Sequence, residues 1–531
     1  MSVSLSRRST LLSSLLLVVA ACGTATAPSG GSSTPAPGAS TASAGTSTAP
    51  STTPNTPQRG GTLRVARSES FDGWDPDKSA AYGSYQTVYA VLEPLVRFGS
   101  DGQSLEPGLA ESWTHDAAAK AWTFVLRKGA TFSDGSPLTS ADVAFSAGVW
   151  KAGPNFGSLY AGIKNVRTPD AQTVVFELSA PNTTLPVLMS ASPSAIFPKD
   201  FGGRTKEAYL AKPIGAGAFT VAEWTPGGRI VLKRSEHYYM ADRPYLDEVV
   251  IDVVADANAR AVLFESGRVD ISEYVGRTTA GQYGDSLVAL PRSQIEHLSL
   301  NTTKPPLDDP QVRQAIARAI DYTAIVGGPF RGYGAPPQGI LAPNLANWAP
   351  PSQPPFSRDV AEARRLLAGS KHPKPGPLEL IYDSGLPDDL LVAQIINSNL
   401  AEIGIEVKLT GLETGAFLDR AFGLKADMVL WSYGAISPDV SDPIGWILGT
   451  SWLFSGFETD TLKKQLSAYN ATASAQEKQQ IIAQVQDQAL QNAQAISLAE
   501  SDVLHAAAKK VHGFASAPWG LYYWDPIWLD H

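Results

Sequence analysis

A strand–helix–strand segment near residue 400 places the strongest constraint on how this 531-residue chain folds. PLELIYD (377–383) reads as a strand, PDDLLVAQIINSNLAEIG (387–404) as a helix ended by Gly404, and IEVKLT (405–410) as a second strand. Short connections between such elements produce a right-handed crossover between parallel strands. ADMVLWS (426–432) predicts a further strand. The sequence therefore predicts an α/β fold with parallel strands in this region.

The residues that follow this last strand are rich in aromatic side chains. WSYGAISPDVSDPIGW (431–446) holds two Trp, one Tyr, two Pro and two Asp. Ligands of open α/β sheets bind beyond the carboxyl ends of strands, so the stretch is predicted to be a ligand-binding loop. Aromatic residues that cap a core give the same pattern. Trp431 and Tyr433 are separated by one residue, so we expect their side chains to face the same way.

The first 21 residues predict an export signal. Two arginines precede the apolar run LLSSLLLVVAA, which is shorter than the about 20 apolar residues of a membrane-spanning helix. Cys22, the only cysteine, follows two alanines as in a bacterial lipobox, whose cysteine is lipidated. We therefore expect Cys22 to anchor the chain to the outer face of the cell membrane, on the periplasmic or extracellular side. SRRSTLL also resembles a twin-arginine signal that lacks its usual Phe, so both export routes stay open.

Residues 22–59 consist almost entirely of Gly, Ala, Ser, Thr and Pro. A segment of this composition cannot bury enough apolar surface to offset its chain entropy, so we expect a disordered tether. From Gly60 onward the composition is globular, and roughly 470 residues are too many for a single hydrophobic core. Because one cysteine cannot form an intramolecular disulfide, packing alone must stabilise this body.

Charge and motif content argue against several classes of function. The formal net charge is −9, and no basic patch is interleaved with aromatics, which argues against nucleic acid as a partner. This mild acidity could favour a cationic cargo, although solubility explains it equally well. The sequence has no zinc-protease, nucleophile-elbow or phosphate-loop motif. The acidic pairs Asp308-Asp309 and Asp388-Asp389 begin predicted helices, where the helix dipole explains them. We therefore predict a non-enzyme without metal or cofactor.

Shorter motifs predict individual turns and helix caps in the body. GAFTVAEWTPGGRIVLKRSE (217–236) predicts a hairpin around its Pro-Gly-Gly turn. Thr139, followed three residues later by Asp142, predicts a helix N-terminus. Asp309 is expected to cap a second helix, with Pro310 at its first position.

In their order along the chain, these motifs resemble family 5 extracellular solute-binding proteins, the dipeptide and oligopeptide receptors of ABC importers. The resemblance runs through GGTLRVA, WDP (74–76), LEPLVRF (92–98), LAESW (109–113), WTFVLRKGATFSDGSPLTSADVAFS (122–146), PIGAGAFTVAEWTPGGRIVLKRSEHYY (213–239), RPYLDEVV (243–250), SGRVDIS (266–272) and NTTKPPLDDPQVRQAIARAID (301–321). It implies a type II periplasmic-binding-protein fold (cluster C), with two lobes of mixed α/β sheet, an extra inserted domain and a hinge cleft.

The resemblance also implies three domains and a mode of action. Domain I is expected at 60–91, 191–298 and 499–531, domain II at 92–190 and domain III at 299–498. Cargo would lie between domains I and III, and closure about the strands that cross near residues 298 and 498 would trap it. The closed form of this receptor, expected to be a monomer, would deliver peptides to an ABC permease and its ATPase.

The loop that corresponds to 431–446 carries, in the dipeptide and oligopeptide receptors, an aspartate that binds the α-amine of the peptide. This sequence departs from their pattern: counted from Trp431 the position is Gly434, whereas counted back from Asp442-Pro443 it is Asp439. We nominate Asp439. By the same resemblance, the further expected cargo contacts are Trp431, Tyr433, Tyr82, Tyr85 and Asn301.

Alternatives stay open for several of these residues and for the function. Asn301 also suits a turn beside a strand end, and Trp446 and Trp452 suit either the lining or the back of a pocket. If Asp439 faces solvent, the cargo needs no free amine, and a sugar, an opine or a metal chelate becomes an alternative. An exported hydrolase and a sensor without transport are the remaining alternatives, and no motif supports either.

Overall fold

The computed structural model describes residues 56–69, 71, 73–78, 82–447, 455–456 and 460–530. The predicted signal, Cys22, most of the predicted tether and Trp452 lie outside these residues. So do the side chains of Tyr82 and Trp446.

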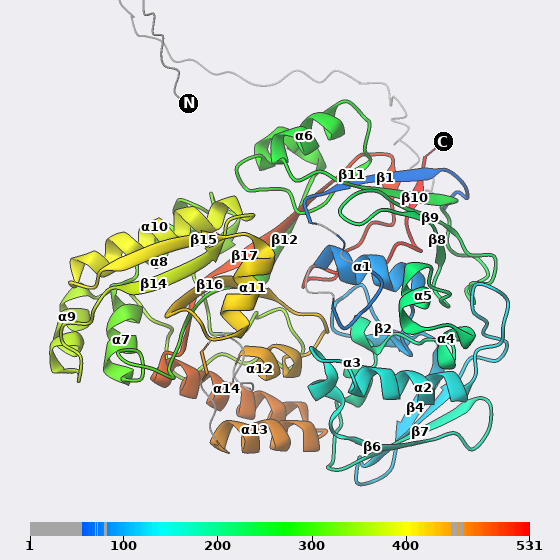
Figure 1. Ribbon diagram of the computed structural model, residues 1–531, viewed down its shortest axis with the longest axis horizontal. Coiled ribbons are helices and arrows are strands. Elements are labelled where there is room, and N and C mark those ends of the chain that lie inside the picture. Colours follow the sequence, from blue (N-terminus) through cyan, green and yellow to red (C-terminus); the bar gives the residue numbers. More distant parts are fainter. Residues whose placement is uncertain are drawn as a thin grey trace, which may run out of the picture. The chain divides into compact units, whose positions relative to one another are not determined.

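One sheet of eleven strands organises the described part of the chain (Figure 1). Its strands are β1 (Thr62–Arg67), β8 (Phe219–Trp224), β9 (Ile230–Arg234), β10 (Glu248–Val253), β11 (Ile271–Ser272), β12 (Leu287–Leu300), β13 (Gly334–Ala335), β14 (Leu378–Asp383), β15 (Val407–Leu412), β16 (Met428–Gly434) and β17 (Ala495–Ala507). Their order is β15-β14-β16-β12-β17-β11-β1-β10-β9-β8, and β13 pairs with β17.

Three smaller sheets accompany the large one. They are β2 (Val96–Phe98) with β3 (Leu105–Pro107), the four-stranded sheet β4 (Ala110–His115), β5 (Ala121–Leu126), β7 (Thr173–Leu178) and β6 (Ile163–Arg167), and β18 (Val511–His512) with β19 (Trp528–Leu529). The four-stranded sheet is antiparallel throughout.

The helices are distributed along the whole described chain. They are α1 (Tyr82–Val91), α2 (Ser140–Lys151), α3 (Leu185–Leu188), α4 (Asp200–Gly203), α5 (Lys206–Ala211), α6 (Ala257–Glu265), α7 (Pro310–Ala319), α8 (Tyr322–Gly327), α9 (Val360–Gly369), α10 (Pro387–Glu402), α11 (Thr414–Phe422), α12 (Ser441–Ile447), α13 (Asp460–Ala471) and α14 (Ala475–Asn492).

The predicted strand–helix–strand unit is confirmed as β14-α10-β15. β14 is parallel to β15 on one side and to β16 on the other. Fully buried side chains, among them Leu380, Ile396 and Leu430, fill the core between these strands and α10. The α/β class expected from the local hydrophobic pattern is therefore confirmed.

The shorter local predictions are also confirmed. β8 and β9 form the antiparallel hairpin expected at residues 217–236. The backbone N–H of Thr139 donates to Asp142 Oδ2 at 2.7 Å, and the Asp309 side chain accepts from the N–H of Gln311 at 2.9 Å. At the start of each helix, an aspartate side chain accepts from a backbone N–H that the helix itself leaves unpaired.

The long strands β12 and β17 connect the two parallel strand groups of the large sheet (Figure 1). They pair antiparallel with each other, but the ladder is irregular at two places. Between Leu290 and Gln294, three residues of β12 oppose one residue of β17, and Arg292 has a φ of 56°. Farther along, Leu498 is left out of the register. Bulges of this kind bend a strand pair and increase its twist.

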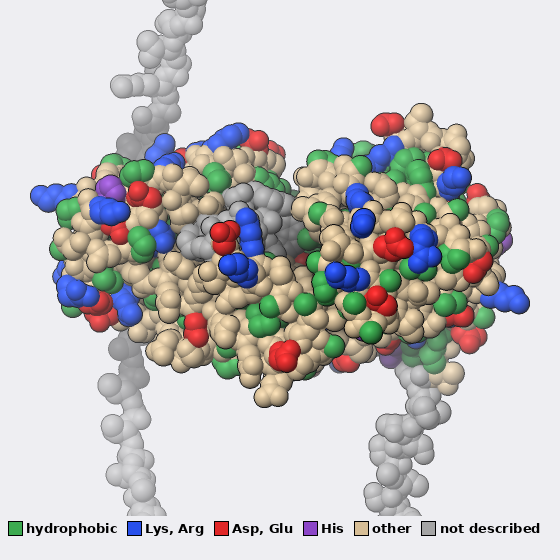
Figure 2. Space-filling model, turned by 90° about the horizontal axis from the view of Figure 1, so that it is seen from below, with side chains coloured by type: hydrophobic (Ala, Val, Ile, Leu, Met, Phe, Trp, Pro, Cys, Tyr) green, Lys and Arg blue, Asp and Glu red, His purple; other side chains and the backbone are tan. Residues whose placement is uncertain are grey.

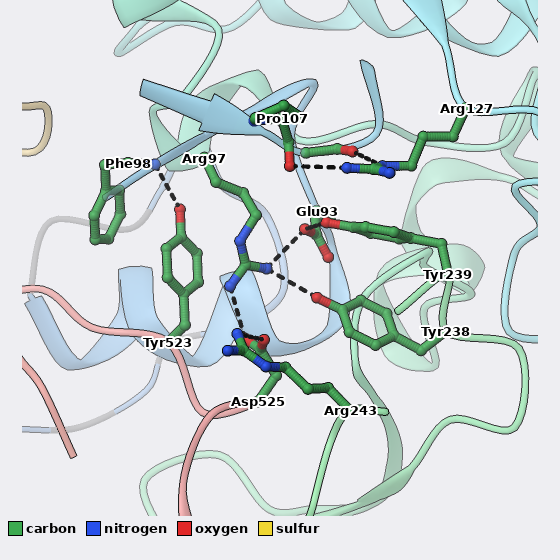
Figure 3. A network of polar contacts seen from close by, with 11 residues as sticks. Glu93, Arg97, Phe98, Pro107, Arg127, Tyr238, Tyr239, Arg243, Tyr523 and Asp525 are labelled. Carbon is green, nitrogen blue, oxygen red and sulfur yellow. Dashed lines mark hydrogen bonds and ion pairs between the residues drawn. The ribbon is translucent and has the colours of Figure 1, made fainter. Parts of the chain in front are cut away.

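A buried ion-pair network ties three distant parts of the chain together (Figure 3). Arg97 donates to Glu93 Oε1 and to the Tyr238 hydroxyl, both at 2.9 Å, and to Asp525 Oδ1 at 2.8 Å. Asp525 Oδ2 also accepts from Arg243 at 3.2 Å. The side chains of Arg97 and Asp525 are only 5% and 3% exposed. Charges so well buried are held by mutual pairing and not by water.

Candidate functional site

The carboxyl ends of the two parallel strand groups point toward each other. β16 ends at Gly434, opposite Gln294 of β12, and β11 ends at Ser272, opposite Ala506 of β17. Because β16 and β11 run in opposite directions, both lead toward the middle of the β12–β17 pair. β14 runs parallel to β16, and β1 runs parallel to β11. The loops that leave these four strands therefore converge at the kind of edge where α/β sheets bind ligands.

An ion pair joins loops from the two strand groups. Arg277, in the loop after β11, places Nη1 3.0 Å from Asp388 Oδ2 in the first turn of α10. Its Nη2 lies 3.8 Å from Glu296 Oε1 on β12, and its guanidinium stacks 4.3 Å above the Phe330 ring. The charge of Arg277 thus lies between carboxylates from two different elements.

The carboxylates around Arg277 are buried and close to one another. Burial, followed by the charges of Glu296, Asp383 and Asp388, raises the pKa of Asp389. Burial also raises the pKa of Glu296, and the positive charge of Arg277 offsets part of this rise. Desolvation and like charges both disfavour ionised carboxylates, so this part of the site favours bound protons or added positive charge.

A second electrostatic interaction between the converging loops involves Tyr85 and Asp442. Tyr85 lies in α1 and Asp442 in α12, and Glu69 lies in the loop after β1. Burial raises the pKa of the Tyr85 phenol, and the nearby charges of Asp442 and then Glu69 raise it further. Glu69 accepts a hydrogen bond from the N–H of Gly83 at 3.1 Å, which holds it beside α1. The predicted residue Tyr85 therefore lies at the convergence of the loops, buried to 4% exposure.

Trp431 and Tyr433 face the same way, as predicted from their spacing. Their ring centroids are 5.9 Å apart, with the rings nearly perpendicular. Trp431 is 8% exposed, and its indole N–H donates to the hydroxyl of Ser299 at 2.8 Å. The His297 ring lies 5.4 Å from the Trp431 ring. Trp431 therefore packs against β12, and its contact with cargo stays a prediction.

Asp439 is buried, at 3% exposure, and its carboxylate accepts three hydrogen bonds from the protein. Oδ1 accepts from the N–H of Ser441 at 2.8 Å and from the Tyr469 hydroxyl at 2.7 Å. Oδ2 accepts from the side-chain amide of Asn347 at 2.7 Å. Asp439 thus links α12, α13 and the 346–347 segment, and its role as amine anchor stays a prediction.

Asn301 makes the contacts of a turn residue. Its side-chain amide donates to the carbonyls of Leu424 and Ala426 at 3.0 Å, and its carbonyl oxygen accepts from both the N–H and the hydroxyl of Thr303. These bonds hold the chain where it leaves β12. They support the turn alternative, and a contact between Asn301 and cargo stays a prediction.

The sequence does not identify Arg277, Glu296 or the interaction of Tyr85 with Asp442. In the sequence, the helix dipole alone is enough to explain the pair Asp388-Asp389. The signal that indicates a further role is the position of the pair directly after the strand at 377–383, since the same position after a strand predicts a ligand-binding loop at 431–446. No comparable signal existed for Arg277, whose partner Asp388 is 111 residues away in the sequence.

Charged side chains of both signs lie on the surface of the described residues. On the face drawn in Figure 2, basic and acidic side chains of the described residues are interspersed and do not form a patch of one sign. Within the described ranges, no His, Cys, Asp and Glu side chains gather as a metal-binding group of three or more. None of the helices in those ranges is long and apolar enough to cross a membrane.

Three comparisons relate this architecture to known proteins. The sequence model of the bacterial extracellular solute-binding proteins, family 5 Middle, matches residues 104–454. The probable D,D-dipeptide-binding periplasmic protein DdpA of Escherichia coli K12 is 25% identical over 468 residues, which cover 84% of this chain and 89% of that protein.

Solved structures match the fold over almost their entire length. The PBP AgaA from A. tumefaciens R10, in complex with agropinic acid, has a TM-score of 0.82 and 28% identity, covering 89% of this chain and 99% of that one. The oligopeptide-binding protein AppA from Bacillus subtilis, in complex with a nonapeptide, has a TM-score of 0.80 and 23% identity. The match covers 90% of this chain and 100% of that one. The expected type II periplasmic-binding-protein fold is therefore confirmed.

Proposed function

This chain belongs to family 5 of the bacterial extracellular solute-binding proteins, and from that premise we propose that it captures peptides for an ABC importer. The observation that carries the proposal is the convergence of loops from two strand groups, joined by the ion pair of Arg277 with Asp388. A ligand at this place contacts both groups at once. Such a ligand stabilises a closed form in proportion to its preference for that form.

In our proposal, the receptor closes about the β12–β17 pair. The bulge at residues 291–293 and the misaligned Leu498 are the irregular places in this ladder, and Leu498 coincides with one of the predicted crossings. Strand irregularities allow the change of backbone angle that hinge closure requires. The division into domain I (60–91, 191–298 and 499–531), domain II (92–190) and domain III (299–498) belongs to the same proposal.

Native mass spectrometry of the purified chain, without added ligand, tests the cargo class. We expect a bound species that is released on denaturation and fragments as a peptide. If nothing co-purifies, a rise in apparent melting temperature with added trialanine serves as the same test, because a ligand that binds only the native state raises stability. A sugar or chelate as the released species, together with no response to trialanine, contradicts the peptide proposal.

An opine is the second candidate cargo. It is favoured by the 28% identity and the TM-score of 0.82 to AgaA, whose structure contains agropinic acid. The internal hydrogen bonds of Asp439 are also compatible with a cargo that lacks a free α-amine. In the same mass-spectrometry experiment, a released opine establishes this candidate and excludes a peptide as the resident cargo.

The amine-anchor role of Asp439 is tested by comparing two ligands on two proteins. Trialanine has a free amine, and N-acetyl-trialanine does not. If Asp439 anchors the amine, Asp439→Asn abolishes the preference for trialanine, because the charge-assisted hydrogen bond is lost. If Asp439 only links α12, α13 and the 346–347 segment, the variant melts at a lower temperature and keeps the preference.

We further propose that Cys22 carries a lipid that holds the receptor at the outer face of the cell membrane. The support is the position of Cys22 directly after the apolar run and before the Gly/Ser/Thr/Pro/Ala segment. Expression in a bacterial host followed by detergent phase partitioning tests this proposal. The natural chain should enter the detergent phase and Cys22→Ser the aqueous phase. Equal partitioning of the two proteins contradicts it.

A further inference from the structure

Four carboxylates lie near the start of α10, and we call them the acidic cluster: Glu296 and Asp388, which both pair with Arg277, Asp383, which ends β14, and Asp389, which follows Asp388 in the chain. Glu296, Asp383 and Asp389 are 5%, 7% and 8% exposed. Arg277 interacts with the cluster and forms its short ion pair with Asp388. The cluster therefore holds more potential negative charge than Arg277 can compensate.

Asp389 is the member of the cluster whose hydrogen bonding is incomplete. Its Oδ2 is buried and, among the described residues, has no hydrogen-bond donor. The other carboxylates do have donors: Asp383 accepts from Gly385, and Glu296 accepts from the Ser501 hydroxyl. A buried carboxylate oxygen without a donor costs free energy, and a ligand that supplies the donor recovers it.

The chemistry of the cluster favours an organic cation. Carboxylates only accept hydrogen bonds, and ammonium and guanidinium groups only donate them. Within the described ranges the carboxylates are not arranged as a metal-binding group. The cluster also belongs to the converging loops, because Asp388 and Asp389 follow β14 and Arg277 follows β11. A bound cation at this place would reach the rest of the cargo site.

We propose that the acidic cluster is a subsite for a cationic group of the cargo, an ammonium or a guanidinium, with Asp389 as its main acceptor. This proposal rests on the proposed function, because the subsite is part of the cargo site. Burial and like charges raise the pKa of Asp389, so the unliganded cluster holds its protons to a higher pH than isolated carboxylates do. The arriving cation favours the ionised carboxylate, so binding releases protons.

Isothermal titration calorimetry with three tripeptides tests the subsite. N-acetyl-Ala-Met-Ala carries no cation, whereas Ala-Met-Ala and N-acetyl-Ala-Lys-Ala each carry one. We expect at least one of the two peptides that carry a cation to bind on the order of ten-fold more tightly than N-acetyl-Ala-Met-Ala, as for a charge-assisted pair. Its binding enthalpy should depend on the ionisation enthalpy of the buffer, which reports proton release.

Asp389→Asn is the decisive variant, and Asp419→Asn is its control. The Asp389→Asn substitution keeps the shape of the side chain and removes its ability to ionise, so the protein should fold. Asp419 lies on α11, where its side chain is 71% exposed and pairs with Lys425 instead of with Arg277. We expect Asp389→Asn to abolish both the preference for the cationic peptide and the buffer dependence, and Asp419→Asn to change neither. Full retention of the preference in Asp389→Asn overturns the subsite.

A separate ligand distinguishes failure of the subsite from failure of the peptide proposal. If no tripeptide binds, 1,5-diaminopentane is titrated into the natural protein and into Asp389→Asn. Binding to the natural protein alone supports the subsite and contradicts peptide as cargo. Binding to neither protein, or equally to both, overturns the subsite.

Discussion

Removal of the Asp525 carboxylate should strongly destabilise the protein. Asp525 receives hydrogen bonds from Arg97 and from Arg243, so Asp525→Ala leaves two guanidinium groups with Glu93 as the remaining acidic group in the network (Figure 3). Arg97 is 5% exposed and cannot turn to water, whereas Arg243 is 38% exposed and can. Almost the whole cost therefore arises at Arg97.

The size of this cost follows from known buried and exposed ion pairs. Removing one partner of a buried pair costs about 3–5 kcal/mol, and an exposed pair is worth about 0–1 kcal/mol. Because Arg97 keeps Glu93, we expect Asp525→Ala to lower the free energy of unfolding by about 3–4 kcal/mol. Asp525→Asn should cost less, because its side-chain oxygen can still accept one of the hydrogen bonds.

Urea unfolding followed by tryptophan fluorescence and by far-UV circular dichroism measures this effect. Coincidence of the two transitions justifies a two-state free energy. The matched control is Asp252→Ala, which breaks an Arg229–Asp252 pair of similar length, 2.7 Å, whose side chains are 55% and 34% exposed. It should cost at most about 1 kcal/mol. A loss below about 1 kcal/mol for Asp525→Ala, or equal losses for both variants, would refute the argument from burial.

Three further predictions concern stability. Burial lowers the pKa of His297 and of His505 to about 3, with the charge of Arg67 contributing at His505. Unfolded histidine takes up a proton near pH 6.5 and the folded residue does not. Each of the two histidines therefore lowers the free energy of unfolding by about 1.7 kcal/mol between pH 6.5 and 5. His297→Phe should therefore lose less stability over this range than the natural protein in urea titrations, and equal losses would contradict the pKa. Ile496→Ala should cost about 2–5 kcal/mol, because the side chain is fully buried; a cost below about 1 kcal/mol in the same assay would be inconsistent with tight packing. Thr139→Ala should cost about 1 kcal/mol through loss of the helix cap, which thermal unfolding detects; no change would mean that the cap is dispensable.

The elements that the sequence predicted well are those whose signals are local. The unit β14-α10-β15, the hairpin β8–β9 and the caps at Thr139 and Asp309 each depend on residues close together in the chain. Periodic apolar positions and capping side chains act over a few residues, so the sequence displays them directly. The resemblance to a family then supplied the overall fold.

The candidate site was only partly predictable. The strand before residues 431–446 is enough to predict the loop from the sequence. The environment of Asp439 within that loop depends on Asn347 and Tyr469, which are 92 and 30 residues away in the chain. The pairing of Arg277 with Asp388 is not predictable for the same reason, because the two residues are 111 positions apart in the sequence. A side chain's partners across such separations depend on how the strands are ordered in the sheet.

The sequence by itself determined the family, the α/β class and the places where strands end. The tertiary structure decided which of those ends meet, because β11 and β16 approach the middle of the β12–β17 pair from opposite directions. It also decided that Asp439 is enclosed by hydrogen bonds while Asp389 keeps a buried oxygen without a donor in the described part of the chain. Both residues are aspartates near strand ends, and burial together with neighbouring donors, which depend on the whole fold, makes them chemically different.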